Sequence, residues 1–254
     1  MGLFIDGVPS SHVDPGNPRR LDFEYMRWIG DVIDSLPGES APLRAVHLGG
    51  AACTLPRYVS ATRPDSRQVV YEVDAEVLDT VRTAFGLRST SRLRLRHGEG
   101  RAGLASLADG SQDLVVRDAF VGDAVPPHLT TVEFLTEVRR VLAPDGVYVA
   151  NLADRPPLRQ ARSEVATALA VFREVALIGE PAQFKGRRHG NLVLLAGGVR
   201  RLEQALVRRL ASGAVRARYL GPDESRGFAA GARALRDPAD NSSGDSTWQR
   251  EPDR

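Results

Sequence analysis

The chain has 254 residues, of which 42% are hydrophobic and 26% are charged, and this length can bury one sizeable core. Its 34 basic and 32 acidic residues give a formal net charge of +2, without a block of like charges, so no nucleic-acid partner is expected. Cys53 is the only cysteine, which excludes an internal disulfide and a cysteine-rich zinc site. No stretch approaches the roughly eighteen apolar residues of a membrane span, and the first residues lack a signal-peptide pattern. We therefore expect a cytoplasmic protein without a metal and without a membrane partner.

Composition divides the chain into three parts. Residues 1–20 contain a short apolar run from Leu3 to Ile5 and then a segment rich in Pro, Ser and Gly, which predicts an N-terminal β hairpin and loop. Residues 21–236 hold nearly all of the apolar periodicity and should form one α/β domain. Residues 237–254 offer almost nothing to bury, so we expect a disordered tail.

Strand and helix patterns alternate through the α/β domain. Apolar residues at helical spacing from Leu21 to Leu36 indicate a lead-in helix that ends before Pro37. Strands are then predicted at 45–48, 68–73, 93–97, 114–118, 146–152, 175–178 and 191–196. Helices are predicted at 55–61, 75–85, 102–107, 131–142, 157–172 and 200–210. This alternation predicts βαβ units and a mostly parallel sheet of seven strands, in which 175–178 and 191–196 form an antiparallel pair.

The first predicted strand ends in a glycine pair, Gly49-Gly50, and about 22 residues later the next strand ends near Glu72 and Asp74. Doubly wound folds hold nucleosides with this arrangement, since glycines admit the ligand and a carboxylate accepts hydrogen bonds from ribose hydroxyls. The spacing does not match G-x-G-x-x-G, so NAD or FAD is not indicated. Glu72 is the candidate ribose ligand, whereas Asp74 is expected to cap the following helix.

Two further strand ends carry acids. Glu99, between two glycines, either accepts a hydrogen bond from an exocyclic adenine amine or is an exposed turn acid. Asp118 ends an apolar run and precedes a loop with Gly and two prolines, where a carboxylate can orient or deprotonate an attacking amine. Arg117, one residue earlier, should point to the opposite face of the sheet. The only lysine is Lys185 and no G-x-S-x-G motif occurs, so NTPase and hydrolase chemistry are not indicated.

Six short motifs together resemble the spermidine synthase family of aminopropyltransferases over about residues 3–196. They are Phe4-Ile5-Asp6-Gly7, Leu48-Gly49-Gly50, Tyr71-Glu72-Val73-Asp74, His97-Gly98-Glu99-Gly100, Val116-Arg117-Asp118-Ala119-Phe120 and Leu142-Ala143-Pro144-Asp145-Gly146-Val147. The resemblance implies a Rossmann-like class I S-adenosylmethionine-dependent methyltransferase fold with a short N-terminal β extension. It also implies transfer of an aminopropyl group from decarboxylated S-adenosylmethionine to a polyamine.

Carried over to this chain, the resemblance assigns a role to each candidate residue. Gly49 and Gly50 would face the aminopropyl or methionine part of the donor, Glu72 would hold the ribose and Glu99 would contact the adenine. Asp118 would lie against the attacking amine of a small-molecule acceptor, in a site that works by positioning and by stabilising positive charge. Family members commonly form dimers or tetramers, so the resemblance implies a homo-oligomer as well, with a homodimer as the first expectation.

The chain also departs from the family pattern. Ala52 stands where the family's glycine loop has an acid for the donor's primary amine, and Val121 stands where a second acid follows the catalytic one, with Asp123 two residues later. These departures leave two alternatives open. One is a small-molecule methyltransferase that uses S-adenosylmethionine, and the other is a non-catalytic nucleoside-binding or scaffold protein.

Overall fold

The computed structural model describes residues 2–5, 8–12, 14, 16–50, 52–87, 89–122, 124–213 and 216–239. Its strands are β1 Gly2–Ile5, β2 Val8–His12, β3 Arg44–Leu48, β4 Arg67–Glu72, β5 Leu93–His97, β6 Gln112–Arg117, β7 Leu142–Asp154, β8 Val175–Gly179, β9 Gly190–Gly197 and β10 Arg218–Leu220. Its helices are α1 Glu24–Ser35, α2 Thr54–Thr62, α3 Ala75–Ala84, α4 Gly100–Ala105, the 3₁₀ turn η1 Pro127–Leu129, α5 Val132–Val141, α6 Arg159–Val171, α7 Pro181–Phe184, α8 Val199–Ser212 and α9 Pro222–Phe228.

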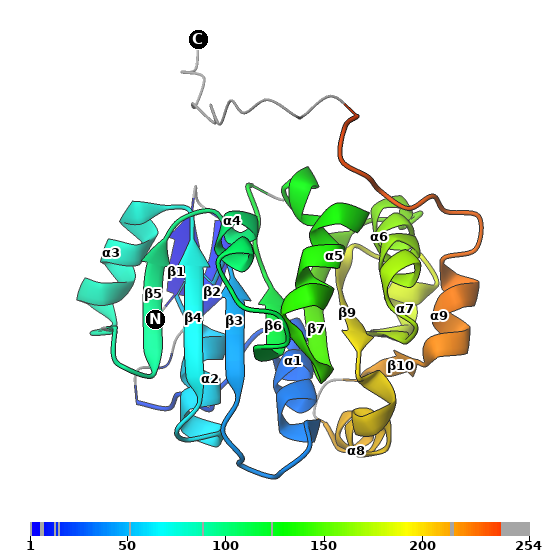
Figure 1. Cartoon of the computed structure of the whole chain (residues 1–254). Helices are drawn as coiled ribbons and strands as arrows, with labels where there is room; N and C mark the ends of the chain where they lie inside the picture. The colour runs from blue at the N-terminus through cyan, green and yellow to red at the C-terminus, as the bar shows by residue number, and fades with distance from the viewer. Residues whose placement is uncertain are drawn as a thin grey trace.

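Eight strands form one sheet in the order β10-β8-β9-β7-β6-β3-β4-β5, and β1 and β2 pair separately as a hairpin (Figure 1). The five strands from β7 to β5 run parallel, whereas β9, β8 and β10 are antiparallel to their neighbours. The predicted antiparallel pair is therefore confirmed as β8 and β9. The sheet has one strand more than the seven expected, because the three-residue strand β10 at its edge is too short to leave an alternating pattern in the sequence.

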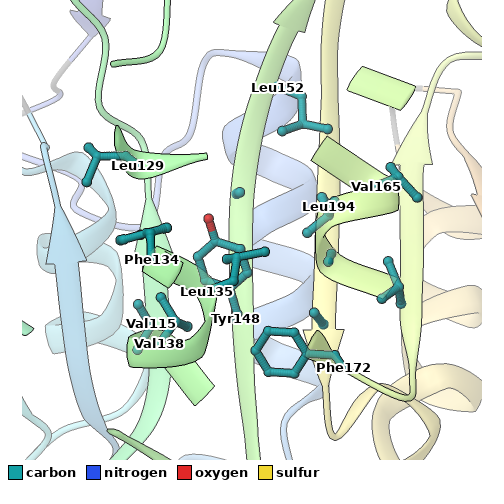
Figure 2. Packing of buried hydrophobic residues seen from close by; sticks show 14 of the residues in the cluster. Val115, Leu129, Phe134, Leu135, Val138, Tyr148, Leu152, Val165, Phe172 and Leu194 are labelled. Atoms are coloured by element: carbon teal, nitrogen blue, oxygen red, sulfur yellow. The ribbon is translucent and has the colours of Figure 1, made fainter. Parts of the chain in front are cut away.

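Helices cover both faces of the sheet, as the alternation of side chains along β7 requires. Val147 and Val149 point into a cluster built with α1, α2 and α8, while Tyr148 and Leu152 point into a second cluster with α4, α5, α6 and α9. Figure 2 shows the second cluster, in which Phe134 of α5 lies beside Tyr148. These β7 side chains are at most 2% exposed, so the two faces share the hydrophobic stabilisation of the domain.

The order of strands reverses between β3 and β6. From β3 the chain moves outward to β4 and β5, and it then returns to β6 on the other side of β3. Open α/β sheets bind ligands at such a switch point, outside the carboxyl ends of the strands. Gly49 follows β3 and Asp118 follows β6, so the fold brings these two predicted site residues to the switch point.

After α9 the chain turns back across the upper end of α6 (Figure 1). Leu235 donates its backbone N–H to Thr167 Oγ1 at 2.8 Å and accepts a hydrogen bond from the backbone N–H of Val132 at 2.9 Å. Asp237, the first residue of the predicted tail, is also hydrogen-bonded to Arg101. The rest of that prediction, from residue 240 onward, lies outside the described residues. Within the described ranges, no helix has the length and apolar character needed to cross a membrane.

Candidate functional site

Polar groups collect where five neighbouring parallel strands end. In spatial order, β5, β4, β3 and β6 present Glu99, Glu72, the Gly49-Gly50 pair and Asp118 at or just beyond these ends, and β7 presents Asn151 three residues before its end. Their registers pair Glu72 with His97, and Leu48 with both Tyr71 and Arg117. The residues predicted to carry function therefore lie side by side at the carboxyl ends of these parallel strands.

The carboxylate of Asp118 is held by side chains from two distant elements. Tyr25 of α1 donates its hydroxyl hydrogen to Oδ2 at 3.2 Å, and Asn151 of β7 donates from Nδ2 to Oδ1 at 3.0 Å. Burial raises the pKa of the half-buried Asp118 carboxyl, and the two hydrogen bonds offset part of that rise. Because both donors are neutral, they orient the carboxylate without cancelling its charge.

Tyr25 was predicted only as part of the apolar face of the lead-in helix. Its hydroxyl reaches a carboxylate 93 residues away in sequence, a separation at which no local pattern signals the contact. Burial and the Asp118 carboxylate raise the pKa of Tyr25 well above its usual value. The phenol therefore remains protonated and can keep donating to Asp118.

The backbone geometry after β3 explains why glycine is needed at position 49. The φ of Gly49 is +75°, and a Cβ at this position would lie 2.6 Å from the backbone oxygen of Asp118. Only glycine allows the turn after β3 to pass this close to the chain leaving β6. At Gly50 φ is +152°, and a Cβ would meet Val70 at 3.4 Å. Contact of this pair with a donor remains a prediction.

A narrow recess opens beneath the glycine turn, and its enclosed space of about 10 Å³ is roughly what one water molecule needs. It is lined by Met26, His47, Leu48, Gly49, Gly50, Thr54, Leu55, Pro56, Val116 and Asp118. The buried His47 is bonded through Nε2 to Gln68 Oε1 at 3.0 Å, and burial lowers its pKa to about 4. His47 is therefore a neutral core residue at the base of the recess.

Asp74 caps the following helix as the sequence predicts, whereas the contact of Glu72 with a ribose remains a prediction. Asp74 caps α3, because its Oδ1 accepts from the backbone N–H groups of Glu76 at 2.9 Å and Val77 at 3.2 Å. Glu72, half-buried at the end of β4, accepts the backbone N–H of Asp74 on Oε1 at 3.1 Å. Since a carboxylate has about four lone-pair sites, this contact is compatible with further hydrogen bonds from a ligand.

Glu99 caps α4. Its Oε1 accepts from the backbone N–H of Arg101 at 2.8 Å and from Nε2 of His128 at 3.0 Å, and its Oε2 accepts from the backbone N–H of Ala102 at 2.8 Å. Burial alone would raise the pKa of Glu99, but these hydrogen bonds hold it below its usual value. His128 was not among the residues predicted for the site, and the structure shows this loop histidine bonded to the acid.

Arg117 points away from the site, which confirms the predicted orientation. Its guanidinium is fully buried and pairs with Glu164 of α6 at 2.7 Å. It also donates to the backbone oxygens of Asn151 at 3.2 Å and Leu129 at 3.4 Å. Arg117 thus fixes the backbone of Asn151, whose side chain holds Asp118 on the other face.

The departures from the family pattern persist in the structure. Ala52 is completely buried and Val121 is 69% exposed, so neither position offers an acid, and Asp123 lies outside the described residues. Among the residues that are described, no group of three or more His, Cys, Asp or Glu side chains forms a metal site.

Known proteins with related chains share this architecture, although no protein-family model matches. The crystal structure of a probable spermidine synthase from Corynebacterium glutamicum matches with a TM-score of 0.85 and 39% identity, covering 98% of this chain and 91% of that one. A polyamine aminopropyltransferase from Vibrio vulnificus is 29% identical over 70% of this chain. The chain spans 57% of the length of this curated relative.

A more distant structure shows the fold alone. Human methyltransferase-like protein 13, in complex with SAH, matches with a TM-score of 0.59 and 22% identity, covering 77% of this chain and 95% of that one. Together with the strand order, these similarities confirm the predicted Rossmann-like class I methyltransferase fold.

Proposed function

The chain belongs to the spermidine synthase family, and on that premise we propose that it transfers an aminopropyl group from decarboxylated S-adenosylmethionine to a small-molecule amine. The observation that carries the proposal is the Asp118 carboxylate, oriented by Tyr25 and Asn151 at the switch point of the sheet. A carboxylate that is fixed but not neutralised suits a cationic or amine-bearing substrate.

An unpartnered oxygen beside Asp118 supports an amine acceptor. Asn151 is 3% exposed, and its Oδ1 has no hydrogen-bond partner among the described residues. A buried acceptor of this kind is costly unless a donor satisfies it. An amine nitrogen carries such donors, and a small shift of the buried Asn151 side chain would let one acceptor molecule bond to Asp118 and Asn151 together.

The reaction follows from this arrangement. The uncharged amine nitrogen attacks the aminopropyl carbon next to the sulfonium, the new C–N bond forms as the C–S bond breaks, and methylthioadenosine leaves. The excess proton on the nitrogen passes to Asp118 or to water. The raised pKa of Asp118 makes it a better proton acceptor than an ordinary aspartate, and its charge stabilises the developing ammonium.

The donor is proposed to lie across the ends of β3, β4 and β5. Glu72 would accept from the ribose hydroxyls, and Glu99 would accept from the adenine amine on Oε2, which accepts one hydrogen bond from Ala102. The glycine pair would face the aminopropyl end. SAH bound by human methyltransferase-like protein 13 supports an adenosyl ligand for this fold.

Methyl transfer from S-adenosylmethionine is the second candidate. Residues 49–54 contain no acid, and Ala52 is buried, so this turn offers no carboxylate for the primary amine of a decarboxylated donor. A non-catalytic nucleoside-binding or scaffold role is the third.

We further propose that the protein is cytoplasmic and acts without nucleic acid or membrane. We also propose that it forms a homodimer, which light scattering would test.

Calorimetric titration of the purified protein with three ligands separates these candidates. Tighter binding of decarboxylated S-adenosylmethionine supports aminopropyl transfer, whereas tighter binding of S-adenosylmethionine favours a methyltransferase. Binding of neither these two nor methylthioadenosine favours the scaffold.

Activity of two variants then tests the role of Asp118. Asp118→Asn should abolish transfer while donor affinity is largely kept. The matched control is Asp113→Asn near the start of β6, because Asp113 pairs with Arg44 at 2.6 Å at the amino ends of β6 and β3 and should not affect transfer. Equal activity of Asp118→Asn and the unchanged protein would remove Asp118 from the mechanism.

A further inference from the structure

A segment close to the C-terminus reaches the adenosyl side of the proposed site. Residues 232–239, which we call the C-terminal strap, follow α9 and cross α6 and α5. Besides the backbone contacts of Leu235, the strap is fixed at Asp237, whose backbone N–H donates to Glu133 Oε2 at 2.9 Å. These contacts bring the Asp237 side chain toward α4.

Asp237 binds Arg101 through both of its carboxylate oxygens. Arg101 Nη1 donates to Oδ1 at 3.0 Å and Nη2 donates to Oδ2 at 2.7 Å, across a separation of 136 residues. Both side chains are 28% exposed. Paired, parallel hydrogen bonds of this type fix a guanidinium in position as well as attract it.

The same arginine contacts the surroundings of Glu99. Arg101 Nη1 also approaches the backbone oxygen of His128 at 3.4 Å. Arg101 donates its backbone N–H to Glu99 Oε1, and His128 Nε2 donates to that same oxygen. The two donors to Glu99 Oε1 are therefore the backbone N–H of Arg101 itself and His128, whose backbone oxygen the Arg101 side chain contacts.

We propose that Asp237 is a positioning residue for the adenosyl end of the donor, acting through Arg101 and His128 on Glu99. This inference rests on the proposed function, because it takes Glu99 as the adenine ligand. Glu99 keeps Oε2 toward a ligand while Arg101 and His128 hold its Oε1, and Asp237 binds the side chain of Arg101. The C-terminal strap is thus part of the donor site although it lies outside the parallel strands.

Asp237→Asn tests the proposal, because it keeps the shape of the side chain and removes its charge. Methylthioadenosine titrated into the variant should bind about 2- to 30-fold more weakly, the range for residues that act on a site through others. In turnover assays the KM for the adenosyl donor should rise while the KM for the amine acceptor stays unchanged. A merely structural contribution of the strap would not separate the two KM values.

Arg236→Ala is the matched control. Arg236 lies on the same strap and pairs with Glu133 at 3.2 Å, with 67% of its side chain exposed. Its replacement should leave methylthioadenosine affinity unchanged. A double variant completes the cycle: Arg101→Gln and Asp237→Asn together should weaken binding no more than Arg101→Gln alone.

The outcomes separate this inference from the proposed function. If the unchanged protein binds no adenosyl compound, the proposed function and the inference both fail. If the unchanged protein and Asp237→Asn bind methylthioadenosine equally, the inference alone is wrong. Faster amide exchange at Arg101 and Ala102 in the ligand-free variant, with unchanged exchange in β7, would support it, and equal exchange at these amides would count against it.

Discussion

Replacing Glu164 by glutamine should destabilise the protein strongly, because it leaves a buried guanidinium without its carboxylate. Arg117 is 0% exposed and pairs with Glu164 at 2.7 Å, its other hydrogen bonds going to backbone oxygens. Its Nε has no partner among the described residues. Removing one partner of a buried pair costs about 3–5 kcal/mol, and we expect about 3 kcal/mol because the amide still accepts one hydrogen bond.

The assay is thermal and urea unfolding of the ligand-free protein. At about 2–4 °C per kcal/mol for a chain of this size, the midpoint should fall by about 6–12 °C. Asp145→Asn is the control, since it removes the exposed pair of Asp145 with Arg201 at 2.6 Å and should cost under about 1 kcal/mol. Replacing Arg117 and Glu164 together by leucine should recover most of the loss. A loss for Glu164→Gln no larger than that of the control would refute the reasoning.

Three further predictions concern the site and its supports. Because burial lowers the pKa of His47 to about 4, the free energy of unfolding should fall by about 3 kcal/mol as the pH drops from 6.5 toward 4. In the His47→Gln variant, the free energy of unfolding should vary less with pH across this window. Tyr25→Phe removes a hydrogen bond that lowers the pKa of Asp118, so the acid limb of the pH–rate profile should move to higher pH, and an unmoved limb would contradict the assignment. Gly49→Ala should lose about 2 kcal/mol more in unfolding than Gly86→Ala, because both have positive φ but only at Gly49 would a Cβ meet backbone.

Local patterns were sufficient to predict most of the architecture. Each of the seven expected strands coincides with an observed strand, and most of its ends differ by no more than about one residue. Apolar alternation and glycine turns indicate these strands in the sequence. The cap at Asp74 was predictable for the same reason, since its partners are two and three residues away. The strand β10 was not predictable, because three residues are too few to show alternation.

The site was predictable only in part, and the limit is sequence separation. The positions of Asp118 and Glu99 beside the switch point were predictable from their places at strand ends, whereas their roles remain predictions. The contacts around them were not predictable, because Tyr25 binds Asp118 across 93 residues and Asp237 binds Arg101, next to Glu99, across 136 residues. His128 lies 29 residues from Glu99, and nothing in its loop distinguishes it from a solvated histidine. Such contacts are consequences of the assembled sheet and not of any local motif.

Asn151 links the two faces of the sheet. Its backbone oxygen accepts a hydrogen bond from Arg117 in the core, while its side-chain amide donates to Asp118 in the site. Replacing Arg117 and Glu164 by leucine would fill the core with apolar side chains. It would also remove the hydrogen bond to the Asn151 backbone, which helps to position the Asn151 side chain against Asp118. Changes to this buried pair should therefore alter the unfolding temperature and the transfer rate together. A variant stabilised at these two positions should be screened for both properties.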